Sequence, residues 1–177
     1  MTEMITIGPA KADEAKAISA VLEQNLEDQG LFQESADAIG LTLGDFPVAH
    51  NEKSEALGYA GLHLDSAVLA EIYAVAVTPE CQGKGVGRRL IQECLRRAWE
   101  RGVRLLWLAT IKPGYFARYG FGRISRWQLP AGVLLRKLRQ TFDQPIRRWR
   151  PALFGRHTFM MCAVRSRPNG DSAKSNP

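Results

Sequence analysis

Three alternate glycines in the segment Gln82-Gly83-Lys84-Gly85-Val86-Gly87 constrain the fold of this 177-residue chain more than any other feature. The apolar segment Ala70–Val77 precedes them, has the composition of a strand, and stops at Pro79. An amphipathic helix is predicted from Gly85 to Arg101, because apolar residues recur there at three- and four-residue spacings. The pattern therefore predicts a strand, a tight glycine turn and a helix in direct succession.

A glycine turn at the amino end of a helix is suited to binding phosphate. The first backbone N–H groups of a helix have no acceptor within it, and the helix dipole favours an anion beside them. Glycines place no Cβ atom in front of these amides, and Lys84, Arg88 and Arg89 add positive charge. A P-loop is excluded because Arg88 and Arg89 follow Gly87, and a dinucleotide fingerprint because Arg88 stands three residues after Gly85.

The remaining segments alternate between strand and helix patterns, which predicts an α/β fold. We expect one domain over residues 1–164 and a solvated tail over 165–177. Helical patterns cover Asp13 to Glu27, Gln33 to Ile39, Tyr115 to Tyr119 and Val133 to Phe142. Strand patterns lie around Ile5 and Ile7, and over Phe46–His50, Leu57–Leu64, Leu105–Ala109, Phe121–Leu129 and His157–Val164, with a hairpin turn at Asn51 to Glu55.

Composition narrows the class of protein. An apolar fraction of 45% with 24% charged residues is ordinary for a soluble globular protein. The chain has no apolar run of about 18 residues and no secretory pattern at its start, so we expect a cytoplasmic protein that does not contact a membrane. Cys81, Cys94 and Cys162 are too far apart for CxxC pairs, and we expect reduced thiols and no metal site.

The formal net charge of +6 indicates an anionic partner. Much of the excess lies between residues 136 and 156, where Asp143 is the single acid beside Arg136, Lys137, Arg139, Arg147, Arg148, Arg150 and Arg156. This stretch has three interpretations: a solvated face, a clamp for an acidic substrate, or a nucleic-acid patch. We expect no nucleic acid as partner, because neither a helix-turn-helix nor an aromatic sheet platform accompanies the charge.

The glycine turn and its surroundings resemble the GCN5-related N-acetyltransferase (GNAT) family. That family's signature, Gln/Arg-x-x-Gly-x-Gly/Ala, is matched by Gln82, Gly85 and Gly87. The segment Glu71–Pro79 is similar to its fourth strand, and Tyr115–Phe121 to its helix-to-strand corner. The resemblance covers roughly residues 56 to 125. It implies a mixed, mostly antiparallel sheet with flanking helices, in which the fourth and fifth strands splay apart.

The resemblance also implies acetyl-CoA as the acyl donor. Backbone groups of Val75 and Val77 would bond its thioester and pantetheine arm. Its pyrophosphate would meet the amides of the turn, contributed by Gln82, Gly83, Lys84, Gly85, Val86, Gly87 and Arg88.

Acyl transfer to an amine requires a base, because only the neutral nitrogen attacks. Glu71 is the candidate, since many family members have a glutamate there; two-residue alternation puts it on one face of the strand with Tyr73, Val75 and Val77. The other interpretation of Glu71 is a solvated carboxylate at the end of the strand, or a salt-bridge partner. For the acid, the family often has a tyrosine where this chain has Phe116. Tyr115 is our candidate, and Tyr119, Tyr73 or a water are the other substitutes.

The acceptor is the least constrained part of the prediction. The corner, the Leu129-Pro130 pair and Gly58–His63 resemble the acetyltransferase domain of N-acetylglutamate synthases, and Arg156 stands where those enzymes often have a basic cluster. We therefore expect direct transfer to the primary amine of a small molecule, an amino acid such as glutamate. The alternatives are an antibiotic- or peptide- and protein-directed acetyltransferase, or a non-catalytic CoA-binding regulatory module. A homodimer stays open.

Overall fold

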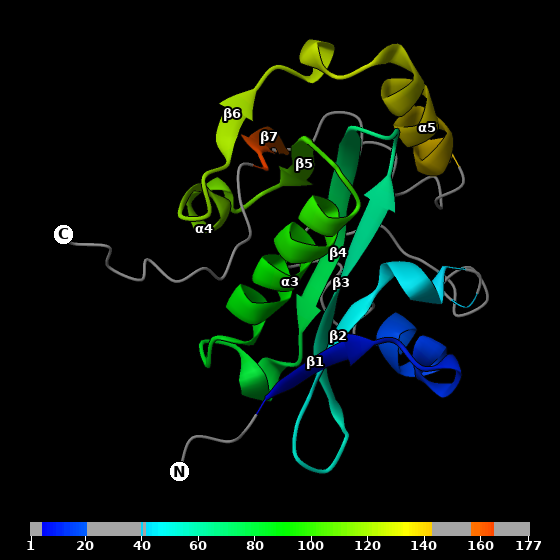
Figure 1. The fold of residues 1–177 in the computed structure, drawn as a ribbon, viewed down its shortest axis with the longest axis vertical. Coiled ribbons are helices and arrows are strands. Elements are labelled where there is room, and N and C mark those ends of the chain that lie inside the picture. Colours follow the sequence, from blue (N-terminus) through cyan, green and yellow to red (C-terminus); the bar gives the residue numbers. More distant parts are fainter. Residues whose placement is uncertain (1–4, 21–39, 41, 143–156, 165–177) are drawn as a thin grey trace, which may run out of the picture.

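A computed structural model describes residues 5–20, 40, 42–142 and 157–164 (Figure 1). Within these residues, seven strands form a sheet in the order β1-β2-β3-β4-β5-β7-β6. Neighbouring strands are antiparallel except β4 and β5, which run parallel. The predicted mixed, mostly antiparallel sheet is therefore confirmed. Its strands are β1 (Thr6–Pro9), β2 (Pro47–His50), β3 (Ala56–Leu64), β4 (Leu69–Val77), β5 (Leu105–Thr110), β6 (Gly122–Ile124) and β7 (Thr158–Ala163).

The helices follow the predicted order. They are α3 (Val86–Glu100), α4 (Pro113–Ala117) and α5 (Ala131–Phe142), and residues 15–20 are helical as well. Short 3-10 turns are η1 (Ala12–Glu14), η2 (Leu43–Asp45), η3 (Pro79–Cys81) and η4 (Arg126–Gln128). The rest of the helix predicted over Asp13 to Glu27, the one over Gln33 to Ile39, Arg156 and the tail 165–177 lie outside the described residues.

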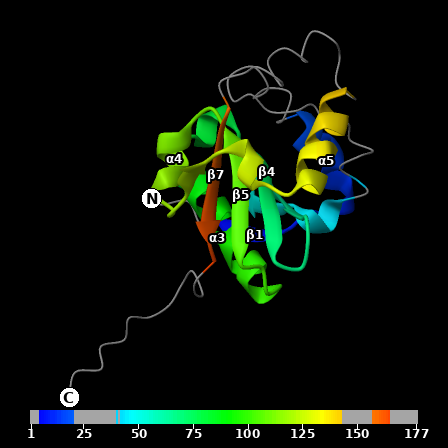
Figure 2. The same cartoon turned by 90° about the horizontal axis from the view of Figure 1, so that it is seen from above.

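Helices cover both faces of the sheet. On one face α3 buries Leu90, Ile91 and Cys94 in the main core, against residues such as Leu106 of β5. On the other face Val133 of α5 packs in a separate cluster with Leu69, Trp107 and Leu129. Figure 2 shows α4 and α5 on opposite sides of β4, β5 and β7. The face under α3 is called the α3 face below, and the opposite one the α5 face.

The two parallel strands separate part-way along their length. Pairing runs from Leu69 with Leu105 to Glu71 with Trp107 and ends there. Beyond this level β4 continues to Val77 and β5 to Thr110 without pairing with each other. The predicted splay of the central strands is therefore present, and it begins at the Glu71–Trp107 pair.

A β-bulge at Ala74 corrects one prediction about β4. Tyr73 pairs with Gly61 and Ala76 with Tyr59, so two residues of β4 oppose one of β3 between these pairs, and Ala74 has a positive φ of 50°. Because of the extra residue, Tyr73 packs on the α5 face whereas Val75 and Val77 pack on the α3 face. The expectation that strict alternation places all three on one face with Glu71 was wrong.

The strand predicted over Phe121 to Leu129 is much shorter than expected. β6 ends at Ile124, and the chain turns into η4. Local hydrogen bonds end the strand: the Ser125 hydroxyl accepts from the Trp127 amide, and the Gln128 side chain accepts from the Ser125 amide. This reciprocal cap satisfies amides that a longer strand would have had to pair.

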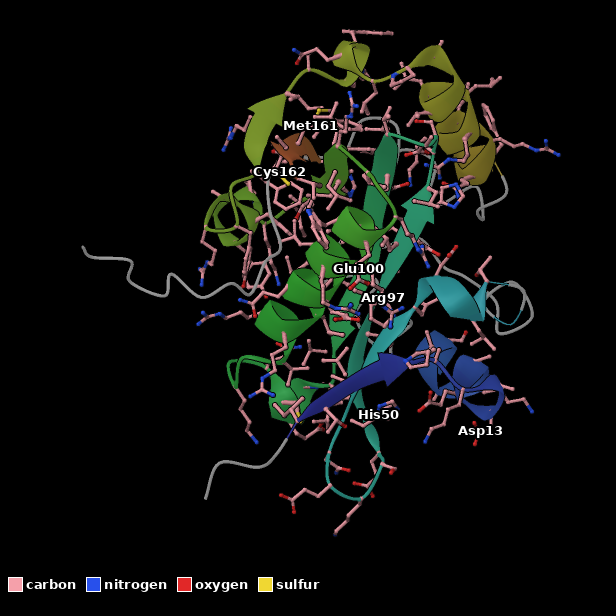
Figure 3. All side chains as sticks on the ribbon, in the orientation of Figure 1. Asp13, His50, Arg97, Glu100, Met161 and Cys162 are labelled. Carbon is pink, nitrogen blue, oxygen red and sulfur yellow. The ribbon has the colours of Figure 1, made fainter. Side chains whose placement is uncertain are left out.

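A buried hydrogen bond between His50 and Glu14 joins the beginning of the first helix to the sheet. Nε2 of His50 on β2 lies 2.5 Å from Oε1 of Glu14, and the other Glu14 oxygen accepts from the Lys11 amide at 2.6 Å. In Figure 3 His50 and Asp13 both lie in the lower part of the molecule, near β1. The pair lies outside the lining of the cleft described next.

Candidate functional site

A cleft of about 560 Å³ occupies the space where β4 and β5 separate. This volume is in the range of pockets that hold small molecules and cofactors. The strands, the glycine turn and α4 all contribute to its walls. It is lined by Ile72, Tyr73, Ala74, Val75, Val77, Cys81, Gln82, Gly83, Gly85, Gly87, Arg88, Leu108, Ala109, Thr110, Ile111, Lys112, Tyr115, Phe116, Arg118 and Tyr119.

The glycine turn forms one end of this cleft. Gly83 and Gly85 have positive φ values of 77° and 84°, which side chains rarely tolerate, and open space surrounds the position of a Cβ at each. The Arg89 amide donates to the Gly85 carbonyl, so the amides of the first helical turn before it have no acceptor within α3. The Gln82 side chain donates to the Val77 carbonyl at 3.3 Å and ties the turn to the end of β4. The turn therefore presents backbone donors to an anion in the cleft.

Position 87 leaves little room for a side chain because a neighbouring residue lies close to it. The backbone angle of Gly87 does not itself call for glycine. A Cβ at this position would lie 2.6 Å from the Tyr115 hydroxyl oxygen. The structure therefore places that hydroxyl against the glycine turn. Burial raises the pKa of Tyr115, and the adjacent Tyr119 raises it further, so the hydroxyl stays protonated at neutral pH. The role of Tyr115 as proton donor to the thiolate stays a prediction.

The side chains around the cleft carry positive charge. Arg88, Lys112 and Arg118 line it, and within the described part of the chain no Asp or Glu does. The guanidinium of Arg118 lies over the Tyr115 ring, 5.2 Å from its centroid. Sequence reasoning named Arg88 but missed Lys112 and Arg118, because their contribution depends on how α4 folds back toward the turn.

Three other residues of the predicted phosphate site lie differently. Arg89 donates to the Ile5 carbonyl at 2.7 Å and so holds the start of β1. Val86 is 1% exposed and belongs to the core, while Lys84 is exposed and outside the cleft lining. The Lys84 amide already donates to the Cys81 carbonyl at 3.4 Å, so of these three residues the backbone amide of Val86 is the candidate for phosphate contact.

Glu71 lies on the α5 face in a cluster of charged residues. Its Oε2 accepts from Arg136 of α5 at 2.7 Å, and its Oε1 is paired with Lys137. Arg136 also bonds Asp65 at 2.6 Å, and Asp65 accepts from the Trp107 indole at 2.7 Å. This arrangement corresponds to the salt-bridge interpretation of Glu71. Its role as catalytic base stays a prediction.

Comparison with known proteins places the chain in a family. The model of the acetyltransferase (GNAT) family matches residues 13–121, and the chain belongs to this family. It is an acyltransferase that uses acetyl-CoA as acyl donor. The cleft fits that donor: at one end lie the first amides of α3, which have no acceptor within the helix, three cations line the walls, and a mostly apolar channel runs between the strands.

Relatives with known names are acetyltransferases. The chain is 30% identical to an N-acetyltransferase of Chlorobaculum tepidum over 124 residues, 70% of this chain and 79% of that protein. It is 31% identical to an amino-acid acetyltransferase of Mycobacterium tuberculosis over 77 residues, 44% of each chain.

Solved structures confirm the fold. A Mycobacterium tuberculosis protein in complex with CoA has a TM-score of 0.74 at 21% identity, over 89% of this chain and 98% of that one. N-acetylglutamate synthase of Neisseria gonorrhoeae, complexed with coenzyme A and N-acetyl-glutamate, has a TM-score of 0.74 at 22% identity, over 92% of this chain and 36% of that one.

The described residues contain no helix with the length and apolar character needed to cross a bilayer. They also contain no group of three or more His, Cys, Asp or Glu side chains placed to hold a metal ion.

Proposed function

We propose that this acetyltransferase transfers the acetyl group to the primary amine of a small molecule, with an amino acid such as glutamate as the leading acceptor. The observation that carries the proposal is the cleft between β4 and β5, because both faces of the sheet contribute to its lining. Val75 and Thr110 belong to the α3 face, where the glycine turn lies, and Tyr73 and Ala74 to the α5 face. A donor on the α3 face leaves the α5 face to the acceptor.

The predicted base is compatible with this direction of approach. Glu71 and Tyr73 share the α5 face and are two residues apart, about 7 Å along an extended strand. An amine entering beside Tyr73 would come within reach of Glu71 directly or through one water. Both Glu71 oxygens already accept bonds from cations, so proton transfer to Glu71 would require one of these bonds to weaken.

The choice of an amino acid rests on relatives. The amino-acid acetyltransferase of Mycobacterium tuberculosis aligns with part of the chain, and the Neisseria gonorrhoeae synthase with N-acetyl-glutamate has the same fold. The basic stretch adds less support than its composition suggests, because Arg136 and Lys137 pair with Asp65 and Glu71. Arg156, the predicted contact to the substrate, lies outside the described residues.

The decisive experiment is an acceptor screen. Purified protein is incubated with acetyl-CoA and single amines, including glutamate, other amino acids, an aminoglycoside and short peptides, and free thiol is measured. We expect release of thiol with an amino acid and a mass gain of one acetyl group on its nitrogen. Preference for a peptide or an aminoglycoside would overturn the proposed acceptor class. Tight CoA binding without turnover on any amine would identify a binding module.

Two glycine variants test the cofactor end of the cleft. Gly85→Ala and Gly102→Ala both place a methyl group at positive φ, 84° and 74°, and neither new Cβ has a neighbour within 4 Å. Each is expected to cost about 1 kcal/mol of stability. By calorimetry, Gly85→Ala should also weaken CoA binding, whereas Gly102→Ala, at the far end of α3, should not. Equal effects of the two variants on CoA affinity would contradict the assignment of the turn.

A further inference from the structure

We propose that the hydroxyl of Thr110 donates a hydrogen bond to the sulfur of CoA and stabilises it as it departs as a thiolate. The inference rests on the acetyl-CoA cleft described above. The Thr110 hydroxyl would be a hydrogen-bond donor on the α3 face of the cleft. The buried side chain of Phe116, on the same face, has no such donor. The position, environment and chemistry of Thr110 each support the assignment.

The level of Thr110 along the cleft is set by the register of the parallel strands. The last β4–β5 pair joins Glu71 and Trp107, and Thr110 and Ala74 each lie three residues beyond it. Since the strands run in the same direction, Thr110 and Ala74 flank the inner part of the cleft, where β4 bulges. The glycine turn follows the end of β4 at Val77. The phosphate end and the inner end are therefore opposite ends of one cleft, and the thioester belongs at the inner end.

The Thr110 side chain points to the side of the sheet where the donor would lie. Alternation along β5 places it on the α3 face with Leu106 and Leu108, while Trp107 packs on the α5 face. Thr110 is 8% exposed and lines the cleft. Its oxygen accepts from the Lys112 amide at 2.9 Å, which fixes the side chain and leaves the hydroxyl proton to be donated. Among the described residues no acceptor for that proton is found.

The other hydroxyl groups of the cleft are less suited to this role. Tyr115 directs its oxygen to Gly87 in the glycine turn. Tyr73 lies on the α5 face, and Tyr119 is half-buried beside Tyr115. Among the hydroxyl side chains that line the cleft, Thr110 is the buried one.

The chemistry requires a donor and not a strong acid. The acceptor nitrogen bonds to the acyl carbon, the carbon–sulfur bond breaks with its electron pair left on sulfur, and the nitrogen loses one proton to the base, directly or through a water. Thr110 keeps its proton throughout, because an aliphatic hydroxyl is a far weaker acid than a thiol. Its contribution is a hydrogen bond that strengthens as negative charge develops on sulfur.

The first test uses binding alone. CoA is titrated with base while bound to the wild type, to Thr110→Val and to Thr110→Ser, and the ultraviolet absorbance of its thiolate is followed. We expect the bound thiol to ionise about 1 pH unit higher in Thr110→Val than in the wild type, because the valine has the same shape and no hydroxyl. Thr110→Ser should stay close to the wild type. Thr158→Val is the control, since Thr158 pairs with Thr110 across β5 and β7 but lies outside the cleft lining.

The second test uses turnover with the best acceptor. Thr110→Val should lower kcat about tenfold with little change in the dissociation constant of CoA. The loss should shrink when the selenoester analogue of acetyl-CoA is the donor, because a selenolate departs without such help. An unchanged titration of the bound thiol in Thr110→Val would overturn the inference and leave the acetyltransferase assignment intact. A wild type that turns over no amine would instead overturn the proposed function, and the binding test would still decide the role of Thr110.

Discussion

Tyr115 and Gly87 form the closest contact between α4 and the glycine turn. The tyrosine hydroxyl occupies the space that a side chain at position 87 would need, and the next nearest Tyr115 atom, Cζ, would lie 3.6 Å from the new Cβ. The steric conflict would therefore involve one oxygen atom. Since Tyr115 also supports Arg118 by stacking, its displacement would disturb the charged wall of the cleft.

This contact predicts that a substitution at Gly87 weakens CoA binding and that a second substitution at Tyr115 restores it. Gly87→Ala should weaken CoA binding by about tenfold, because a gap of 2.6 Å forces Tyr115 away from the turn. Tyr115→Phe removes the conflicting oxygen, so the double variant should recover most of the affinity. Calorimetry on the four proteins of this cycle measures the coupling between the two residues. Additive losses would show that Tyr115 does not occupy the position described.

The Tyr115→Phe variant also tests the catalytic prediction. If Tyr115 protonates the thiolate, its loss should lower kcat and change the alkaline limb of the pH profile. If it only shapes the cleft, kcat should change little, and the binding of CoA should carry the effect.

At the scale of elements, charged residues join α5 to β4. Arg136 and Lys137 reach from the helix to Glu71, whose side chain is 3% exposed, while theirs are 25% and 19% exposed. Breaking a fully buried pair costs about 3–5 kcal/mol, and an exposed one about 0–1 kcal/mol. Because Arg136 and Lys137 are partly exposed, the cost of breaking this contact is expected to lie between these two values. The contact spans 65 residues in the sequence and therefore stabilises tertiary structure.

Glu71→Gln should lower the free energy of unfolding by about 1–3 kcal/mol, because two cations then face a neutral amide. Combining it with Lys137→Met removes one of these cations and should restore part of the loss. Urea denaturation measures both effects. A variant as stable as the wild type would contradict the ion-pair geometry.

The same variant separates the two interpretations of Glu71. If Glu71 is the catalytic base, Glu71→Gln should lower the turnover rate and displace the pH dependence of that rate to higher pH. The affinity for CoA should stay unchanged. A purely structural carboxylate would lower stability and leave the pH profile in place. Lys137→Met alone controls for the disturbance of α5.

At the scale of the whole molecule, part of the positive charge behind the net charge of +6 lies around the cleft. Arg88, Lys112 and Arg118 line the cleft without a charged partner among the described residues. CoA carries several phosphate charges, so its affinity should fall when salt is raised from about 0.05 M to about 0.5 M, because the cations are near the surface and are screened.

Arg118→Gln should reduce that salt dependence and weaken binding at low salt several-fold. Arg104→Gln is the matched control, because Arg104 is exposed at the start of β5 and outside the cleft lining. Calorimetric titrations at both salt concentrations provide the comparison. Identical salt dependence in the two variants would exclude Arg118 from the cofactor site.

Local patterns were sufficient for part of this structure. The strand, glycine turn and helix from β4 to α3 could be predicted because each depends on neighbouring residues: strand composition, positive φ at Gly83 and Gly85, and helical periodicity. The same holds for the hairpin at Asn51 to Glu55, where the Asn51 side chain accepts from the Lys53 and Glu55 amides. These local elements are also the basis for predicting a phosphate site at this end of the cleft.

The inner part of the site was decided by tertiary structure. The bulge at Ala74 arises from the register of β4 against β3, and it alone sets which side chains of β4 share a face. The placement of α5 pairs Glu71 with Arg136, and the parallel register of β4 and β5 brings Thr110 level with Ala74. No short-range pattern encodes contacts between residues this far apart in the chain. The sequence by itself therefore determined the fold class and the cofactor, and the packing of distant elements decided which side chains lie around the point where β4 and β5 separate.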